Sequence, residues 1–249
     1  MNDGIIIQAR TGSTRLPNKI LLPFYGDKSI LDVIIEGIRS ECADKLIVLA
    51  TTDAVQDNIL EQYALKNNIV CYRGSEDNVL DRFINAAKEN NLARFVRVCS
   101  DNPFLRVDTF NNLFEAHDEL KCDYVAYGFA DGRPTIKSHL GLFSELTTLD
   151  ALQRVAQLTS EKLYIEHVTI YLYTHLTQFS IKLLNLPLEL EERTDLRLTL
   201  DTMDDFKLLQ EIYAKYVETD KSIEALLRLI DANPGYKILM RQNIKCNEK

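Results

Sequence analysis

The segment GIIIQARTGSTRLPNK (4–19) joins a short apolar run to a loop of small, hydroxyl-bearing and basic residues. Three successive isoleucines after Gly4 predict a strand that is buried on both faces, as in a parallel sheet. The loop that follows contains Arg10, Arg15 and Lys19 among small and hydroxyl-bearing residues. Backbone N–H groups of such a loop can contact phosphate oxygens while the cations neutralise their charge. Strand and loop together therefore predict an α/β fold that binds an anionic group at a strand end.

The spacing of the glycines excludes two common phosphate-binding loops. A Walker A loop requires GxxxxGK[ST], and dinucleotide-binding folds carry GxGxxG, and the segment has neither pattern. A solvated loop whose cations contact only water remains the alternative interpretation.

Strand patterns alternate with amphipathic helical patterns through the first half of the chain. We expect strands at 4–7, 45–51, 69–72, 95–98 and 123–127, and helices near 30–41, 55–67, 79–90 and 107–120. This alternation predicts a mostly parallel sheet with helices on both faces. Ligands of such sheets bind beyond the carboxyl ends of the strands, so the residues that follow each strand are the first candidates for a site.

The pattern changes after about Tyr127, where a loop rich in glycine and polar residues begins. We interpret 128–193 as an excursion from the sheet that covers the acceptor substrate or forms a dimer contact. The elements expected from there onward are a strand at 139–144, helices at 145–157 and 166–176, a strand at 179–185, a strand pattern at 196–202, and helices at about 203–216 and 222–232. All of these belong to a single domain of 1–249.

Composition limits the classes of function. The chain has 249 residues and a formal net charge of −8, and no basic stripe stands out. Binding to a nucleic acid backbone requires clustered Lys and Arg, so we expect no nucleic acid partner.

The cysteines and the apolar runs indicate a location. The five cysteines are odd in number and form no CxxC pair, so neither a disulfide framework nor a zinc site is expected. No apolar run reaches the roughly 20 residues that span a bilayer. We therefore expect a cytoplasmic protein with free thiols and no membrane partner.

Two aspartates follow strand patterns. RVCSDNP places Asp101 just beyond one strand, and LRLTLDT places Asp201 at the end of another. Mg²⁺ typically takes one or two carboxylates, with phosphate and water completing its shell. Asp101 alone could instead be a turn residue that bonds its own backbone. Thr202 is expected to cap the following helix, with Asp204 and Asp205 in its first turn.

The loop resembles the signature ARxGSxRLPxK of the CMP-sugar synthetases, the acylneuraminate and 3-deoxy-manno-octulosonate cytidylyltransferases. It is most similar to the branch typified by spore coat polysaccharide biosynthesis protein F. YRGSEDNVLDRF, RVCSDNP, EHVTIYLY and RLTLDTMDD resemble further family blocks in the family's order, so the resemblance covers about Ile5 to Tyr213. It implies a Rossmann-like nucleotidyltransferase fold, usually homodimeric, that uses Mg²⁺ to transfer CMP from CTP to an acidic sugar and releases pyrophosphate, for cell-surface polysaccharide synthesis.

The resemblance also assigns roles to residues of this chain. It implies that catalysis uses Arg10, Arg15, Lys19, Asp101 and Asp201, and that Asp101 and Asp201 hold the metal. The residues expected to bind CTP are Ala9, Arg10, Thr11, Gly12, Ser13, Lys19, Arg73, Ser75, Arg82 and Ser100. Two of these have alternative interpretations, because Ser75 could cap the helix that begins near Asn78 and Arg82 could belong to an ion pair.

The acceptor should contact the excursion and its flanks. The candidates that we assign are Arg133, Lys137, His139 and His167. An acidic sugar needs a cation for its carboxylate, and this set supplies several. A half-buried histidine bonded to backbone is the alternative for His167.

Three departures from the family pattern concern the loop and the acceptor. Asn18 stands where the family often has glycine, and Cys99–Ser100 stand where sugar-activating relatives usually have Gln-Gly. PTIKSHLGLFS (134–144) replaces an acidic strand of the GxDxE type. The acceptor is therefore open, and a phosphorylated or phosphonylated acceptor giving a CDP-linked product is an alternative. A glycosyltransferase of related fold, which the lack of a DxD motif disfavours, and a silent nucleotide-binding protein are further alternatives.

Overall fold

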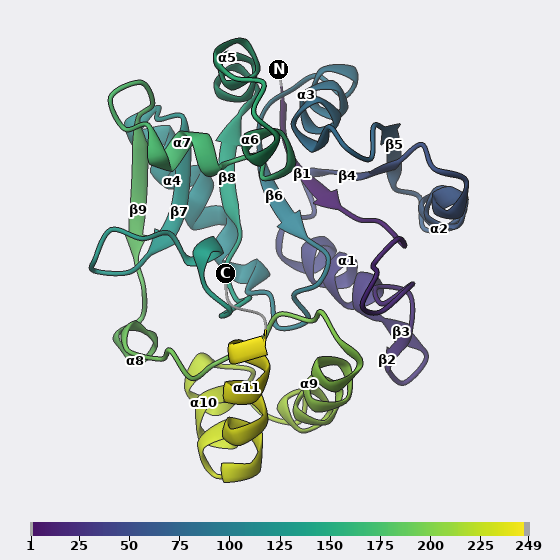
Figure 1. Ribbon diagram of the computed structural model, residues 1–249, viewed down its shortest axis with the longest axis vertical. Coiled ribbons are helices and arrows are strands. Elements are labelled where there is room, and N and C mark those ends of the chain that lie inside the picture. Colours follow the sequence, from purple (N-terminus) through teal and green to yellow (C-terminus); the bar gives the residue numbers. More distant parts are fainter. Residues whose placement is uncertain (1, 247–249) are drawn as a thin grey trace.

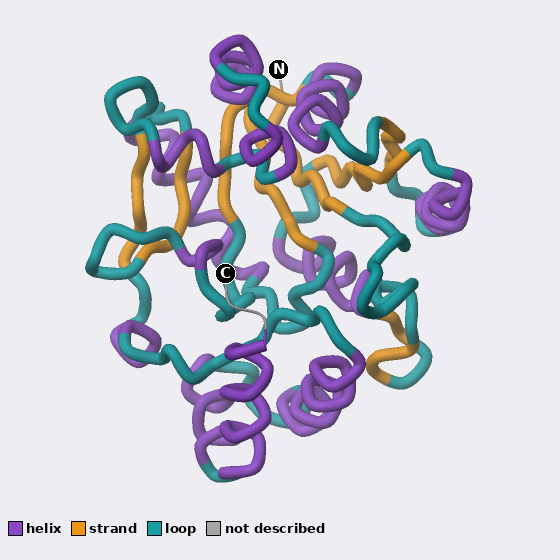
Figure 2. The backbone as a smooth tube through the Cα atoms, in the orientation of Figure 1, coloured by secondary structure: helices purple, strands orange, loops and turns teal. Residues whose placement is uncertain are grey.

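The computed structural model describes residues 2–246, and within them a sheet of seven strands forms the centre of the molecule (Figures 1 and 2). The order across the sheet is β5-β4-β1-β6-β8-β7-β9. The strands are β1 (Asn2–Gln8), β4 (Leu46–Thr52), β5 (Val70–Gly74), β6 (Leu92–Cys99), β7 (Tyr124–Gly128), β8 (Glu145–Thr148) and β9 (Ile181–Asn185). Strand β8 is antiparallel to both of its neighbours, and the other pairings are parallel. The expected mostly parallel sheet is therefore confirmed.

Helices cover both faces of this sheet. The helices of the described chain are α1 (Ile30–Glu41), α2 (Asn58–Lys66), α3 (Val79–Glu89), α4 (Phe110–Leu120), α5 (Leu149–Leu158), α6 (Lys162–Glu166), α7 (Ile170–Thr174), α8 (Leu188–Glu191), α9 (Met203–Tyr216), α10 (Ile223–Asp231) and α11 (Pro234–Cys246). Short 3₁₀ turns are η1 (Val55–Asp57), η2 (Val107–Thr109) and η3 (Thr135–Lys137), and β2 (Pro23–Tyr25) and β3 (Lys28–Ser29) form a small separate ribbon.

The alternation of side chains along β1 divides the core in two. Ile5 and Ile7 pack with α1, α2 and α4 on one face, whereas Ile6 packs with α3, α5 and α7 on the other. Helices α9, α10 and α11 extend the first cluster and gather at one end of the molecule (Figure 1). Each isoleucine of the opening segment is completely buried, as the apolar run predicts.

The first half of the chain follows the sequence closely. All five strands expected there and all four helices are present, with ends shifted by a few residues and with 3₁₀ turns preceding α2 and α4. Helix α1 begins with a capping box between Ser29 and Asp32, and α9 begins with one between Thr202 and Asp205. The Thr202 cap is thus confirmed.

The second half corrects several expectations. No strand forms at 139–144, and the strand follows at Glu145–Thr148 instead, so α5 begins at Leu149. Glu145 pairs in register with Arg97 of β6 and forms a buried ion pair with it at 2.7 Å, which holds it in the sheet. Of the helix expected at 166–176, only α7 forms, since Glu166 is the last residue of α6. Thr169, just before α7, donates a hydrogen bond to Glu145.

The segment 128–193 also returns to the sheet, which the interpretation as an excursion had not anticipated. It contributes β8 and β9, and β8 lies between β6 and β7. The strand pattern at 196–202 is likewise not a strand of the sheet. Its backbone is held by two loops instead, since Leu198 N donates to His139 O and Leu200 N to Asp101 O. Helix α11 was not anticipated.

Neither a disulfide nor a membrane-spanning helix occurs within residues 2–246. All five cysteines are free thiols. None of the helices in the described part combines the length and the apolar character that crossing a bilayer requires.

Candidate active site

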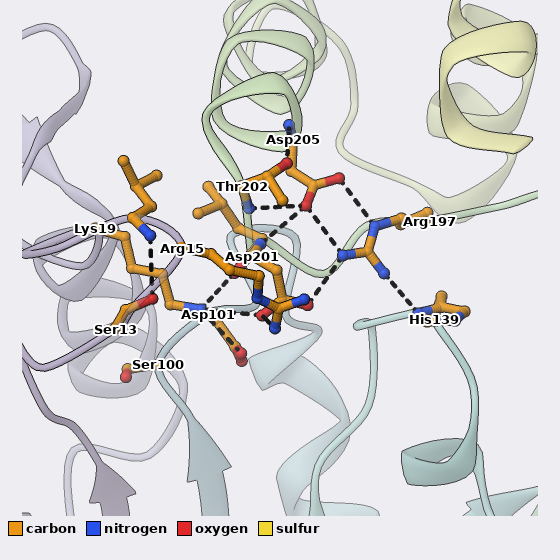
Figure 3. Close-up of polar contacts among 12 residues, drawn as sticks. Ser13, Arg15, Lys19, Ser100, Asp101, His139, Arg197, Asp201, Thr202 and Asp205 are labelled. Atoms are coloured by element: carbon orange, nitrogen blue, oxygen red, sulfur yellow. Dashed lines mark hydrogen bonds and ion pairs between the residues drawn. The ribbon is translucent and has the colours of Figure 1, made fainter. Parts of the chain in front are cut away.

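The site lies where β1 and β6 end side by side and the chain turns into two loops (Figure 1). The loop after β1 carries the predicted phosphate-binding residues, and Asp101 follows β6. The extended segment 196–201 brings Asp201 to the same place, which Figure 3 shows with the neighbouring side chains. The structure therefore brings the three chain segments with the predicted catalytic residues together.

A buried aspartate fixes the start of the loop after β1. Thr11 donates to Asp57 from its backbone N at 2.8 Å and from its hydroxyl at 2.6 Å, and Thr52 donates to the same carboxylate. Burial by itself would raise the pKa of Asp57, but the hydrogen bonds from Thr11 and Thr52 outweigh it and lower the pKa. Asp57 is a positioning residue that sequence reasoning missed.

Asn18 explains one departure from the family pattern. Its φ of 57° lies in the left-handed region, where glycine is at ease and asparagine is the best tolerated alternative. Its backbone N donates to Thr11 O at 3.1 Å, which closes the loop upon itself. The replacement of glycine by Asn18 therefore leaves the loop conformation attainable.

Lys19 joins the two predicted metal ligands. Its Nζ lies 3.5 Å from Asp101 Oδ2 and 3.3 Å from Asp201 Oδ1, and it donates to Leu200 O at 2.6 Å (Figure 3). Arg15 approaches Asp201 Oδ1 to 3.0 Å. Burial would raise the pKa of Asp201, but the charges of Lys19 and Arg15 outweigh it and lower the pKa. Asp201 is therefore ionised at neutral pH.

This pair of carboxylates fits a magnesium ion that is shared with substrate phosphates. Within residues 2–246 no three His, Cys, Asp or Glu side chains form a metal cluster, so the candidate ligands in that part of the chain are the two aspartates. The ammonium of Lys19 contacts both carboxylates, which demonstrates that one cation can interact with Asp101 and Asp201 together. Two carboxylates plus phosphate and water is the usual environment of Mg²⁺ at phosphoryl-transfer sites.

Two cavities adjoin at the aspartates. The first, which we call the loop cavity, has a volume of about 240 Å³ and is lined by basic and hydroxyl groups, Arg10, Ser13, Thr14, Lys19 and Ser100 among them. The second, the hydroxyl cavity, has a volume of about 190 Å³ and is lined by Asn102, Thr135, Ser138 and Thr199 with apolar Ile136 and Phe143. Both cavities share Arg15, Cys99, Asp101 and Asp201. Asp101 and Asp201 thus lie between a cationic and a hydroxyl-rich compartment.

The predicted CTP-binding residues divide into two groups. Arg10, Ser13, Lys19 and Ser100 line the loop cavity, and Ala9, Thr11 and Gly12 belong to the same loop. Arg73, Ser75 and Arg82 come from β5, the following turn and α3.

The donors of Arg73 are directed into the fold. They contact Thr52 O, Ala54 O, Asn58 and Glu61, so this side chain fastens β5 to α2.

Arg82 is buried without a carboxylate partner among the described residues. It is 1 % exposed, its NH1 donates to Ser75 O at 2.7 Å, and its Nε has no hydrogen-bond acceptor. Burial lowers its pKa, and the nearby charge of Arg10 acts in the same direction. The alternative that Arg82 forms an ion pair is therefore wrong. Asn78 caps α3, so the alternative that Ser75 is the helix cap is wrong as well.

None of the four acceptor candidates lines the hydroxyl cavity. Arg133 pairs with Asp131 and covers the ring of Phe129, and His167 ends α6. Lys137 lies in η3, and the Nδ1 of His139 accepts a hydrogen bond from Arg197 at 2.7 Å.

Apart from the residues that it shares with the loop cavity, the hydroxyl cavity is lined by residues that sequence reasoning missed. For Thr199 the sequence did contain a signal, the alternation in LRLTLDT. The leucines of this segment are buried in the core, and Thr199 alternates with them on the same side as Asp201.

The fold and the site together define a nucleotidyltransferase, an enzyme class with a parallel sheet, a cationic loop after the first strand and aspartates at strand ends. The chain belongs to the cytidylyltransferase family, whose model matches residues 4–236. This membership favours a nucleotidyltransferase over the glycosyltransferase and silent-binder alternatives.

Individual relatives agree with the family. The spore coat polysaccharide biosynthesis protein SpsF of Bacillus subtilis is 33% identical over 94% of this chain and 96% of its own length. A solved cytidylyltransferase from Leptospira borgpetersenii is 29% identical with a TM-score of 0.80, covering 95% of this chain and 96% of that one. A CMP:2-keto-3-deoxy-manno-octonic acid synthetase, solved in complex with CTP, shares the fold at 16% identity and a TM-score of 0.62, covering 86% of this chain and 99% of that one. The resemblance inferred from the motifs is confirmed.

Proposed function

We propose that this enzyme transfers CMP from CTP to an acidic sugar in a Mg²⁺-dependent reaction that releases pyrophosphate, as a step in cell-surface polysaccharide synthesis. The observation that carries the proposal is the position of Asp101 and Asp201 between the loop cavity and the hydroxyl cavity. A triphosphate and a polyhydroxylated acceptor placed in these two cavities would meet at the two carboxylates. The SpsF relative, named for polysaccharide biosynthesis, supports the pathway class.

The transfer is a single displacement at the α-phosphorus of CTP. An acceptor hydroxyl oxygen forms the new P–O bond, the bond to the β-phosphate oxygen breaks, and the hydroxyl proton is released to solvent. Arg10, Arg15 and Lys19 neutralise the charge that gathers on the departing pyrophosphate. Mg²⁺, when held by Asp101 and Asp201, would add Lewis-acid stabilisation of the phosphate oxygens.

The buried guanidinium of Arg82 supports recognition of the nucleoside. A buried cation without an ion-pair partner is costly unless it serves a ligand or a dipole. Cytosine offers acceptors at O2 and N3, and Arg82 with the backbone of the 73–77 turn would supply donors to them. We therefore keep Ser75 and Arg82 as candidates for the base and ribose, with Arg73 holding the turn in place.

The lining of the hydroxyl cavity supports a sugar acid as the acceptor. Asn102, Thr135, Ser138 and Thr199 offer hydrogen bonds to hydroxyl groups, and Arg15 offers a cation to a carboxylate. A phosphate dianion would call for more positive charge than this lining provides among the described residues. An acidic monosaccharide fits both the polar groups and the single adjoining cation.

We infer that the protein is a homodimer. The exposed leucines Leu158, Leu163 and Leu176 on the 128–193 segment support this, and light scattering after gel filtration would test it.

We also infer a cytoplasmic location, from the free thiols and the use of CTP.

The test is pyrophosphate release from CTP and Mg²⁺ with a panel of 3-deoxy-2-ulosonic acids and simple alcohol phosphates. We expect release with an ulosonic acid and none when EDTA is added. Release only with a phosphate ester would replace the CMP-sugar product by a CDP-linked one. Silence across the panel together with failure to bind CTP would overturn the proposal.

A further inference from the structure

The carboxylate of Asp201 is oriented by a contact to the oxygen that does not face the two cations of the loop. Its Oδ2 accepts a hydrogen bond from Arg197 NH2 at 2.9 Å, whereas its Oδ1 faces Arg15 and Lys19 (Figure 3). Arg197 is buried, and each of its guanidinium nitrogens already donates to His139, Asp201 or Asp205. The orientation of Asp201 therefore depends on what fixes Arg197.

Asp205 fixes Arg197. The Nε and NH2 of Arg197 donate to Asp205 Oδ1 and Oδ2 at 2.9 and 3.0 Å, the bidentate geometry of a guanidinium–carboxylate pair. Asp205 Oδ2 also accepts from the backbone N of Asp201 and Thr202, both at 3.0 Å. One buried carboxylate thus holds the side chain that orients Asp201 and the main chain of Asp201 itself.

The remaining donor to Asp205 comes from the end of the described chain. Asn243 Nδ2 of α11 donates to Asp205 Oδ1 at 2.9 Å. With five donors and an exposure of 2 %, Asp205 is saturated and is not itself available to a metal.

Helix α11 is well placed to transmit a constraint. Tyr236 and Met240 anchor it in the core, and Asn243 lies one turn beyond Met240 on the same side. The amide of Asn243 is thereby held at a fixed position relative to α9, which begins at the Thr202 cap.

We propose that Asn243 is a positioning residue for the metal-binding aspartate, acting through Asp205 and Arg197 on Asp201. Without its amide, Asp205 Oδ1 keeps the Nε of Arg197 as its one donor among the described residues, and the carboxylate loses the contact that fixes it from the side of α11. Arg197 and the Oδ1 of Asp201 would then shift away from the arrangement that suits the metal. The inference rests on the proposed function, in which Asp201 binds Mg²⁺.

The test is calorimetric titration of CTP without acceptor, with Mg²⁺ and with EDTA, so that no turnover takes place. The dissociation constant of CTP in EDTA divided by that in Mg²⁺ measures the coupling between metal and nucleotide. Outer partners of metal ligands typically change metal affinity by about 10–100-fold, and Asn243 acts through two intermediates. We therefore expect Asn243→Ala to reduce the ratio by roughly 3–10-fold while binding in EDTA stays unchanged, and Asn243→Asp, which opposes two carboxylates, to reduce it further.

Gln242→Ala is the matched control, since Gln242 is the exposed neighbour of Asn243 on α11, and it should retain the wild-type ratio. Asn243→Ser keeps a shorter donor and should fall between wild type and Asn243→Ala. Thermal melts establish that each variant is folded at the titration temperature. A wild-type ratio in Asn243→Ala, even with a lowered melting temperature, would overturn the inference and leave a purely structural contact. Absence of Mg²⁺-dependent CTP binding in the wild type would instead overturn the proposed function, and the inference with it.

Discussion

At the scale of single residues, Lys19 shows how the site balances charge. Two like charges in one small site repel each other. Lys19 contacts both carboxylates and Arg15 contacts Asp201, so these cations offset the repulsion in the absence of ligand. The same cations lie on the wall of the loop cavity, where a triphosphate would compete for them.

Replacing Lys19 should therefore nearly abolish turnover. Loss of one electrostatic contact to a developing charge typically costs about 10²–10³ in rate, so we expect Lys19→Ala and Asp201→Ala each to lose that much in pyrophosphate release. Lys28→Ala is the control, because Lys28 pairs with Glu36 on the surface, away from both cavities, and its rate should not change. Near-full activity of Lys19→Ala would contradict the assignment.

Asp57 links the conformation of the loop to pH. Its folded pKa lies below the ordinary value of 3.8, so its ionised form stabilises the fold above that value. This stabilisation is lost as the pH falls through the folded pKa. Asp57→Asn should lower the free energy of unfolding at pH 7 by about 1–3 kcal/mol and flatten its decline below about pH 4.

Chemical denaturation at several pH values measures this difference. Asp27→Asn, at an exposed turn carboxylate, should leave the stability nearly unchanged. An Asp57→Asn curve parallel to that of the wild type would show that the buried hydrogen bonds do not depend on ionisation.

At the scale of elements, the extended segment 196–201 depends on two separate parts of the chain for its position. It is held between the loop at His139 and the turn at Asp101, through one backbone hydrogen bond to each. Gly141 makes this possible, since a Cβ there would lie 3.0 Å from the backbone C and O of Leu198 and the φ of Gly141 is +59°. The close approach of the two backbones depends on the absence of a side chain.

A pair of glycine variants distinguishes the cost of a left-handed backbone from the cost of a steric clash with the segment 196–201. Gly132 also has a positive φ, of +84°, but a Cβ there would meet nothing within 4 Å. Gly141→Ala and Gly132→Ala should each lose about 1–2 kcal/mol of unfolding free energy from the left-handed backbone. Only Gly141→Ala should in addition reduce the rate of pyrophosphate release, because it displaces the segment that carries Asp201. Equal rates in the two variants would show that the segment tolerates the displacement.

At the scale of the whole molecule, the site is assembled from distant parts of the chain. The loop after β1, the turn after β6, η3 and the segment before α9 all contribute to two adjoining cavities. A ligand that fills them would connect these parts and should stabilise the domain as a unit.

Binding of CTP and Mg²⁺ should therefore raise the melting temperature. At a concentration about 100 times the dissociation constant, a ligand adds about 2.7 kcal/mol, which corresponds to roughly 5–10 °C for a domain of this size. The rise should be smaller with EDTA and with UTP, and nearly absent in Lys19→Ala. An equal rise with UTP would contradict recognition of cytosine, and an equal rise with EDTA would contradict the role of the metal.

The sequence by itself determined the sheet of the first half and the content of the loop cavity. The isoleucines of β1, the cations of the loop after it and Asp101 after β6 are local patterns, and each follows from the burial or the chemistry of a short segment. The Thr202 cap was predictable for the same reason. Strand ends and caps need no knowledge of distant partners.

Tertiary structure alone decided the rest, because the deciding partners are far apart in the chain. Glu145 belongs to a strand rather than to a helix because it pairs with Arg97, 48 residues away. His139 faces Arg197 rather than the acceptor, and Asn243 reaches Asp205, 38 residues away. Buried charges must find partners wherever the fold places them, and no local pattern reveals which partner that will be.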